Sequence, residues 1–91
     1  MRLDLFLKSS RLCLRRTVAQ QLCDAGLVAV NNKPAKSSTT VQPGDELSIR
    51  RRDCVLRVRI VALPANRQTS RSEATNLYEI LSEEKLEDPG I

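Results

Sequence analysis

The stretch RLDLFLKSSRLCLRRTVAQQLCDAGLVAVN, residues 2–31, decides the fold because its hydrophobic pattern predicts two helices followed by a strand. Leu3, Phe6 and Leu7 recur at the i, i+3, i+4 spacing that places apolar side chains on one helix face. This spacing predicts a short helix over residues 2–9. A helix of this length is unstable alone, so the residues that follow must provide a partner for its apolar face.

A second helix is predicted to begin at residue 15 or 17 and to end at Ala25. Thr17 and Gln20 have the spacing of a capping box, in which the two side chains bond free amides at a helix N-terminus. Gly26 supplies the left-handed conformation that ends many helices. Val18, Leu22 and Ala25 are expected on the buried face, so the two helices form a hairpin.

Beyond the hairpin the pattern is typical of strands. Residues 27–31 predict one strand, and the asparagines of the turn at residues 31–33 tolerate positive φ. Residues 34–36 predict a brief returning strand. In the segment Gln42-Pro43-Gly44-Asp45, proline followed by glycine predicts a type II turn.

Two further strands are predicted after this turn, one around Leu47 and Ile49 and one over residues 54–63. In the second, Arg57 and Arg59 alternate with apolar residues. One face of the sheet should therefore be apolar and the other basic. The arginines could equally be the solvated face of an edge strand.

The last third is predicted to be a linker at residues 64–69, an additional C-terminal helix and an acidic tail at residues 83–91. Ser70 and Glu73 offer a capping box, and the next apolar residues have helical spacing. We thus expect an α+β fold, with a domain at residues 1–63 and an appendage at residues 64–91. The apolar stripe of the C-terminal helix consists of Ala74, Leu77, Tyr78 and Leu81.

Charge is distributed unevenly along the 91 residues, whose formal net charge is +4. Residues 1–59 hold 12 Lys and Arg against 5 Asp and Glu, net +7, whereas residues 60–91 hold 3 against 6, net −3. A basic body indicates a polyanionic partner, because neutralising phosphates releases counterions. Aromatic residues make up only 2% of the chain, so RNA should be recognised by shape rather than by base stacking.

Catalysis and metal binding lack the residues they require. The chain has no histidine, no Gly-rich phosphate loop and no nucleophile in an elbow motif. Cys13, Cys23 and Cys54 are odd in number and far apart, which favours small buried hydrophobic residues over disulfides or zinc ligands. We expect a protein that is not an enzyme and uses no metal or cofactor.

The cell compartment is predicted from what the sequence lacks. No apolar stretch of signal-peptide length follows Met1, so the cytosol is expected. An anionic membrane surface is the rival partner for a basic body, but no lipidation motif or long apolar run supports it. We therefore expect no membrane partner.

Basic side chains crowd the two predicted helices. Arg15 and Arg16 lie at the start of the second helix, where free amides and the helix dipole favour a phosphate. Arg11 and Arg15 are four residues apart, and a bound anion would relieve a like-charge repulsion of roughly 0.2 to 0.5 kcal/mol on a helix. Asp4 is expected to pair with Lys8 or to hold a neighbouring arginine in position. The predicted phosphate site is Arg2, Lys8, Arg11, Arg15 and Arg16, although each alone could be ordinary solvated surface.

A second group of polar residues lies on the predicted β-turn and its returning strand. Asn31, Lys33 and Lys36 could contact ribose or phosphate, and ordinary turn chemistry with exposed lysines explains them equally well. The charge run at residues 50–52 is suggestive but unspecific. We include the three turn residues in the predicted RNA-binding site.

The order of these motifs resembles the S4 domain, an RNA-binding domain named after small-subunit ribosomal protein four. The resemblance spans about residues 1–50 and implies the S4-like αL fold, a short helical hairpin packed on a small antiparallel sheet. Asn32 stands where such domains usually have glycine, which asparagine can replace in the same turn. The residues on which the resemblance to the S4 domain rests are Arg2-Leu3-Asp4-Leu5-Phe6-Leu7, Arg11, Arg15, Arg16, Ala19, Gly26-Leu27-Val28-Ala29-Val30-Asn31, Lys36 and Pro43-Gly44-Asp45.

Within this superfamily the chain looks most like the bacterial proteins of ribosome-associated quality control, because of its compact length and the predicted helix over residues 74–81. This resemblance implies a monomeric factor that binds ribosomal RNA and peptidyl-tRNA on obstructed large ribosomal subunits. It also implies support for the addition of C-terminal alanine tails by a partner, RqcH. A related heat-shock RNA-binding protein, which recycles free large subunits carrying peptidyl-tRNA, usually has a long basic tail, whereas this chain ends acidic.

Two other classes of function are compatible with the sequence. One is a protein interaction module in which Leu77, Tyr78 and Leu81 bind a partner helix and the basic face is incidental. The other is a detached RNA-binding appendage of a synthetase or pseudouridine synthase, which would need a catalytic domain that these residues do not supply. An RNA-binding factor remains the leading hypothesis.

Overall fold

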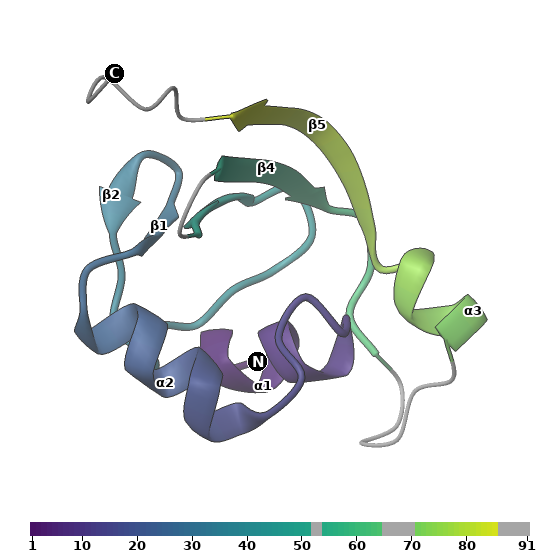
Figure 1. Cartoon of the computed structure of the whole chain (residues 1–91). Helices are drawn as coiled ribbons and strands as arrows, with labels where there is room; N and C mark the ends of the chain where they lie inside the picture. Colours follow the sequence, from purple (N-terminus) through teal and green to yellow (C-terminus); the bar gives the residue numbers. More distant parts are fainter. Residues whose placement is uncertain (52–53, 65–70, 86–91) are drawn as a thin grey trace.

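The computed structural model describes residues 1–51, 54–64 and 71–85, which form a helical layer packed on a sheet (Figure 1). Strand order is β2-β1-β3-β4-β5, and each neighbouring pair is antiparallel. This arrangement confirms the α+β class and the helical hairpin packed on a small antiparallel sheet. The elements are α1 (Leu3–Ser9), α2 (Arg16–Asp24), β1 (Val28–Val30), β2 (Lys33–Pro34), β3 (Glu46–Arg50), β4 (Cys54–Ile60), α3 (Arg71–Thr75) and β5 (Tyr78–Lys85).

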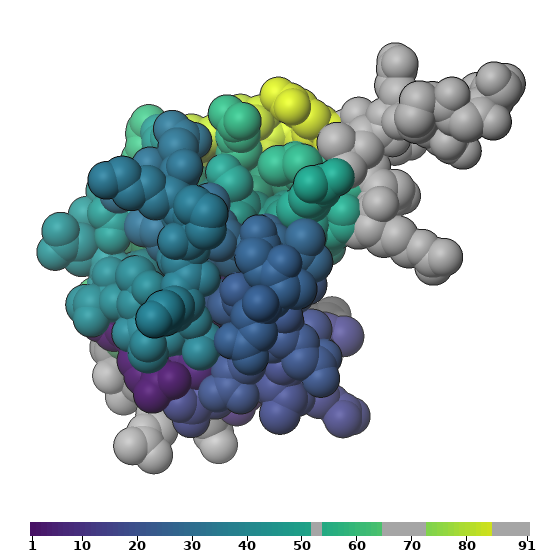
Figure 2. Space-filling view, turned by 90° about the vertical axis from the view of Figure 1, so that its left-hand side faces the viewer, coloured from purple at the N-terminus to yellow at the C-terminus, as the bar shows by residue number. Residues whose placement is uncertain are grey.

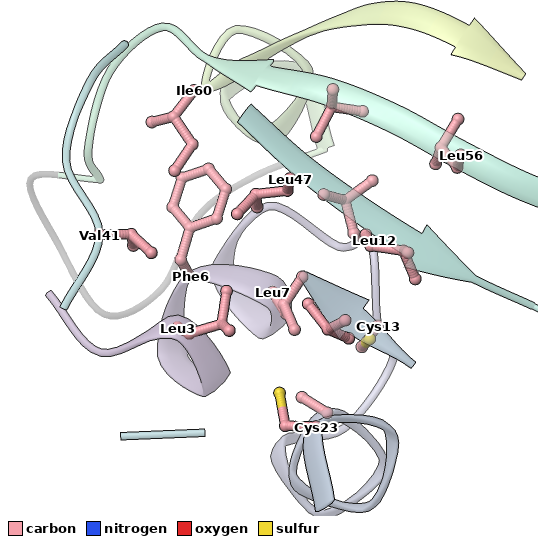
Figure 3. Close-up of a cluster of buried hydrophobic side chains, with 14 of the residues drawn as sticks. Leu3, Phe6, Leu7, Leu12, Cys13, Cys23, Val41, Leu47, Leu56 and Ile60 are labelled. Atoms are coloured by element: carbon pink, nitrogen blue, oxygen red, sulfur yellow. The ribbon is translucent and has the colours of Figure 1, made fainter. Parts of the chain in front are cut away.

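The core lies between α1 and the sheet. Leu3, Phe6 and Leu7 are fully buried, as the helical spacing predicts. The Phe6 ring points from α1 toward Leu47 of β3 and Ile60 of β4 (Figure 3). One aromatic ring thus joins the helical layer to two neighbouring interior strands of the sheet.

Helix α2 packs through smaller side chains than the sequence indicates. Ala19 and Cys23 are its buried residues, whereas Val18 and Ala25 are exposed, so the predicted buried face is wrong. Ala19 and Cys23 are four residues apart, so they lie on the same face of α2, and this face rather than that of Val18 and Ala25 is covered by the core. Leu22 packs only partly against the core.

The start of α2 also differs from the prediction. Arg15 is the N-cap, and no side chain caps the helix, so the expected capping box of Thr17 and Gln20 is wrong. The end of α2 is as predicted. Gly26 has φ 75°, and the amides of Gly26 and Leu27 donate to carbonyls in the last turn of the helix. This pair of bonds is the Schellman motif, which satisfies carbonyls that the helix end would leave free.

Turn chemistry sets the register of the sheet. Asn31 and Asn32 have φ 52° and 69°, which gives the primed two-residue turn of a β-hairpin between Val30 and Lys33. Gly44 has φ 96°, and the Asp45 amide bonds the Gln42 carbonyl, as a type II turn requires. Both predicted turns are confirmed.

The sheet has an apolar inner face and a polar outer face. Leu47 and Ile49 of β3 pair with Val58 and Leu56 of β4, and all four are buried. The intervening β4 residues Arg57 and Arg59 are exposed. The alternation predicted for these strands is confirmed, with β4 ending at Ile60 rather than at residue 63.

The predicted C-terminal helix is wrong in its second half. Helix α3 ends at Thr75, and Tyr78–Lys85 forms β5, which pairs along the whole of β4. Spacing at residues 74–81 fits one face of a helix, but the backbone of β4 would have no partner on that side, and pairing with it overrides the local signal. Of the predicted linker and tail, residues 65–70 and 86–91 lie outside the described residues. The division at residue 63 stays a prediction.

Among the described residues, no helix combines the length and the apolar character that crossing a membrane requires.

Replacing Phe6 by alanine should lower the free energy of unfolding by about 3 to 5 kcal/mol, because it removes the ring that joins both layers and leaves a cavity. Urea denaturation followed by circular dichroism measures the loss. Val61→Ala is the matched control, since Val61 is 53% exposed and its truncation should change stability by less than about 0.5 kcal/mol. Equal losses in the two variants would contradict the central position of Phe6.

Candidate nucleic-acid interface

One buried carboxylate organises the basic surface. Asp4 lies in the first turn of α1 and is fully buried. Its Oδ1 accepts hydrogen bonds from the Leu5 amide at 2.8 Å and from Arg2 Nε at 3.2 Å. Its Oδ2 accepts hydrogen bonds from Gln20 Nε2 at 3.0 Å, Arg16 Nε at 3.1 Å and Arg2 Nη2 at 3.3 Å. Of the two roles expected for Asp4, the structure therefore shows the one that holds arginines in position.

The backbone positions of Arg2 and Arg16 are set by contacts and elements other than the bonds to Asp4. Arg2 forms a β-bridge with Thr40, and the Leu3 amide bonds the Thr39 carbonyl at 2.8 Å. Arg16 is the first residue of α2. The N-terminus and the second helix thus present two guanidinium groups beside one carboxylate.

Both guanidinium groups keep donors available for a ligand. The side chains of Arg2 and Arg16 are each 44% exposed, whereas Asp4 is fully buried. Among the described residues, Arg16 contacts Asp4 through Nε, which leaves its terminal amino groups to bind an anion. Two positive charges against one negative charge leave this cluster net positive.

The hydrogen bonds keep Asp4 ionised. Burial raises the pKa of Asp4, but the hydrogen bonds from Gln20, Arg16, Arg2 and the Leu5 amide lower it and together prevail, so the pKa lies below its ordinary value. The carboxylate is therefore charged at neutral pH and attracts both guanidinium groups.

The remaining basic residues of the helical region are exposed. Lys8 lies in the last turn of α1, and Arg15 is the N-cap of α2. Arg11 lies between the helices with φ 61°, so the predicted repulsion between residues four apart on one helix does not apply. Arg15 and Arg16 do stand together at the N-terminus of α2, as the sequence indicates.

The returning strand predicted at residues 34–36 is β2 at Lys33–Pro34, so Asn31 and Lys33 lie on the β-hairpin and Lys36 follows it. Asn31 donates from Nδ2 to Asp45 Oδ1 at 3.2 Å and accepts the Glu46 amide at its Oδ1 at 3.0 Å. Lys33 and Lys36 are exposed. The face in Figure 2 shows the N-terminal residues in purple, α2 in blue and the hairpin above them in blue to teal. The N-terminal residues, α2 and the hairpin, to which most of the predicted residues belong, therefore share one side of the molecule.

Two contributors were absent from the predicted site. Gln20 lies one turn after Arg16 on the same face of α2, so both reach Asp4, and this i, i+4 spacing is the signal that points to it. Arg51 donates from Nη2 to the Leu12 carbonyl at 2.9 Å and ties the strand region to the loop between the helices. Nothing in the sequence indicates that long-range bond.

The cysteines do not form a reactive or metal-binding site among the described residues. No group of three His, Cys, Asp or Glu side chains there is placed to hold a metal ion. Cys13 and Cys23 are buried, as predicted, whereas Cys54 is only half-buried. Burial raises the pKa of the Cys13 thiol and raises that of Cys23 to about 11, so both are protonated thiols at neutral pH.

Comparison with known proteins gives matches along nearly the whole chain. The family model of the S4 domain matches residues 1–47. A protein named RQC P-site tRNA stabilizing factor from Bacillus subtilis (strain 168) is 46% identical over 94% of this chain and 98% of its own length. A protein of the same name from Listeria innocua is 43% identical over 97% of this chain and 94% of its own length.

Solved structures with the same fold are also found. The trimeric structure of Vibrio cholerae heat shock protein 15 matches with a TM-score of 0.80 and 28% identity, over 90% of this chain and 82% of that one. The solution structure of hypothetical protein HP1423 matches with a TM-score of 0.78 and 31% identity, over 92% of this chain and all of that one. Both likenesses extend beyond the residues that the family model matches.

Replacing Asp4 by asparagine should destabilise the protein on the order of 1 to 3 kcal/mol at pH 7, because the arginines lose their buried counter-charge. The pKa of Asp4 is lowered on folding, so its stabilisation is present above the ordinary carboxyl pKa and is lost as pH falls through the folded value. The difference between wild type and Asp4→Asn should therefore shrink below about pH 4. Urea unfolding at several pH values measures it, and a difference that stays constant from pH 7 to pH 2 would refute the role.

Proposed function

The chain belongs to the S4-domain family of RQC P-site tRNA stabilizing factors, and we propose on that premise that it is a non-catalytic RNA-binding factor of ribosome-associated quality control. The observation that carries the proposal is the pair Arg2 and Arg16, held together on Asp4 at the N-terminus of α2. Its RNA ligands are ribosomal RNA of the large subunit and the P-site peptidyl-tRNA.

The site has the chemistry to bind a phosphate. Helix α2 begins without a side-chain cap, so amides of its first turn can donate to an anion. The terminal amino groups of Arg16 add charged donors in a planar fork that matches two phosphate oxygens. Because Asp4 fixes the guanidinium before RNA arrives, little side-chain entropy is lost on binding.

The rest of the basic face extends the contact. Lys8, Arg11 and Arg15 belong to the helical region. The β1–β2 hairpin, which carries Lys33 and is followed by Lys36, lies on the same side of the molecule as α2 (Figure 2). Asn31 contributes by fixing the hairpin, and any ribose contact would use the second hydrogen of its Nδ2 or the remaining lone pair of its Oδ1. We assign the helical residues to ribosomal RNA, with Lys8 and the hairpin toward tRNA.

Recognition should depend on RNA shape and backbone rather than on base identity. The chain has one phenylalanine, one tyrosine and no tryptophan. Phe6 is buried in the core, and Tyr78 is half-buried in β5. Without an exposed aromatic platform, arginine and lysine contacts to phosphate dominate the interface.

A factor that grips ribosomal RNA and tRNA together would act by holding the tRNA in one position. Binding one position more tightly than another shifts the translocation equilibrium without a chemical step. In this role the chain would act as a cytoplasmic monomer on obstructed large subunits and support alanine tailing by RqcH. No catalytic residue is needed.

The structural likeness to heat shock protein 15 favours a second candidate function, the recycling of free large subunits that carry peptidyl-tRNA. Sedimentation of the protein with cell extracts discriminates the two: co-migration with RqcH supports quality control, whereas co-migration with free subunits in cells lacking RqcH supports recycling. The third candidate, a helix-binding stripe, loses its basis because Leu77 is buried and Tyr78 and Leu81 belong to a strand.

Replacing Arg16 by alanine should weaken binding to large ribosomal subunits by about 5- to 150-fold, equivalent to about 1 to 3 kcal/mol, because a charged bidentate donor is lost. For wild type, log affinity should fall with log salt at a slope of about −3 to −4 if about four phosphates are neutralised, and the variant's slope should be shallower by about one. Co-sedimentation at several salt concentrations measures both.

Arg57→Ala is the matched control, since it removes the same charge from the outer face of the sheet, where Arg57 is exposed. Its binding should match wild type after allowance for the loss of one unit of net charge. Unchanged co-sedimentation of folded Arg16→Ala, or a wild-type salt slope near zero, would sink the electrostatic account.

A further inference from the structure

Leu14 is an apolar side chain exposed to solvent, and its neighbours in the chain include Arg11, Arg15 and Arg16. It is 90% exposed, more than any other large hydrophobic residue among those the structure describes. It lies in the loop at residues 10–15, between α1 and α2. The two residues before it, Leu12 and Cys13, are buried in the core. The loop therefore already has its anchors, and Leu14 is not one of them.

An apolar residue just before a helix N-cap usually packs on the first turns of that helix, but Leu14 does not. Arg15 is the N-cap of α2, so Leu14 occupies the position before the cap, from which a side chain often packs on the fourth helical residue. That residue is Ala19, which is buried against the core while Leu14 remains exposed. Leu14 thus stabilises neither the helix start nor the core.

The loop holds Leu14 in a defined place. The Cys13 amide bonds the Leu7 carbonyl at 3.0 Å, and Arg51 Nη2 bonds the Leu12 carbonyl at 2.9 Å. Arg11, in the same loop, has φ 61°, a conformation that non-glycine residues seldom adopt and that concentrates at functional sites. A side chain presented from a fixed backbone loses little entropy when it meets a partner.

The charge around Leu14 indicates the chemistry of that partner. Residues 5–23 include Lys8, Arg11, Arg15 and Arg16 but no acidic side chain. Val18, one turn into α2, adds a second, 39% exposed apolar side chain. A ligand that fits must combine negative charge with an apolar surface, and RNA does so wherever a nucleotide is unpaired and its base face is accessible.

We propose that Leu14 packs on the face of an unpaired nucleotide of the bound RNA, beside phosphates held by Arg15 and Arg16. The inference rests on the proposed RNA-binding function and deepens it by naming the RNA class: a helix interrupted by a bulge or closed by a loop, rather than an uninterrupted duplex. In a continuous duplex the base faces are stacked, so Leu14 has nothing apolar to cover. Leucine is among the residues that act as such wedges in nucleic-acid complexes.

The test measures the affinity of the full chain for two blunt-ended RNA duplexes of equal length, one fully paired and one whose stem carries a single unpaired nucleotide. Wild type should prefer the bulged stem. Leu14→Ser should weaken binding to the bulged RNA by about 3- to 10-fold at every salt concentration, because partial burial of one leucine is lost and no charge changes. Its salt slope should equal that of wild type.

Val61→Ser is the matched control, because Val61 is also exposed and lies after β4, outside the loop between the helices. It should bind both RNAs as wild type does. Circular dichroism should show both variants folded, since neither side chain belongs to the core.

The outcomes separate this proposal from the one it rests on. If Leu14→Ser binds both RNAs as wild type does, Leu14 makes no contact, and a weakened Arg16→Ala leaves the RNA-binding function standing. An equal loss on both RNAs would overturn the preference for unpaired nucleotides. If neither Arg16→Ala nor added salt weakens binding to either RNA, the proposed function itself fails.

Discussion

The Asp4 carboxylate joins two segments that are distant in the chain: the start of α1, where Arg2 is the N-cap, and α2, through Arg16 and Gln20. A buried carboxylate costs several kcal/mol unless it is paired and hydrogen-bonded, so this packing of the two helices persists only while those donors stay in place. The same bonds aim two guanidinium groups at solvent. Fold and candidate site therefore depend on one set of contacts.

Features governed by local chemistry could be predicted from the sequence. Positive φ at Asn31 and Asn32 and the Pro-Gly turn before β3 follow from what those residue types tolerate. The buried face of α1 follows from the spacing of its apolar residues, because a short helix with one apolar face must pack that face against the rest of the protein. The basic cluster was visible as charge, and its position at the start of α2 followed from the helix boundary.

Features decided by distant contacts could not be predicted. Gln20 reads as half of a capping box, but the buried carboxylate on α1 recruits it instead. The residues of β5 have helical spacing, but the open edge of β4 supplies backbone partners that no local signal records. Leu14 reads as one more apolar residue, and only its exposure beside buried Leu12 and Cys13 distinguishes it. In each case the competing partner is more than ten residues away or absent from the chain.

The charge asymmetry of the sequence becomes an asymmetry in space. The sheet order places β2 and β5 at opposite edges, so the lysine-bearing hairpin and the acidic strand are separated by the width of the sheet. Exposed Glu79, Glu83 and Glu84 lie on β5, whereas the residues proposed to bind phosphate belong to the helical region and to the segment around the hairpin. A polyanion is attracted to one side and repelled from the other over about one Debye length, roughly 8 Å at physiological salt. In the proposed function this asymmetry would orient RNA before contact, and Asp4, which is buried and hydrogen-bonded, would add little repulsion at the surface that presents the arginines.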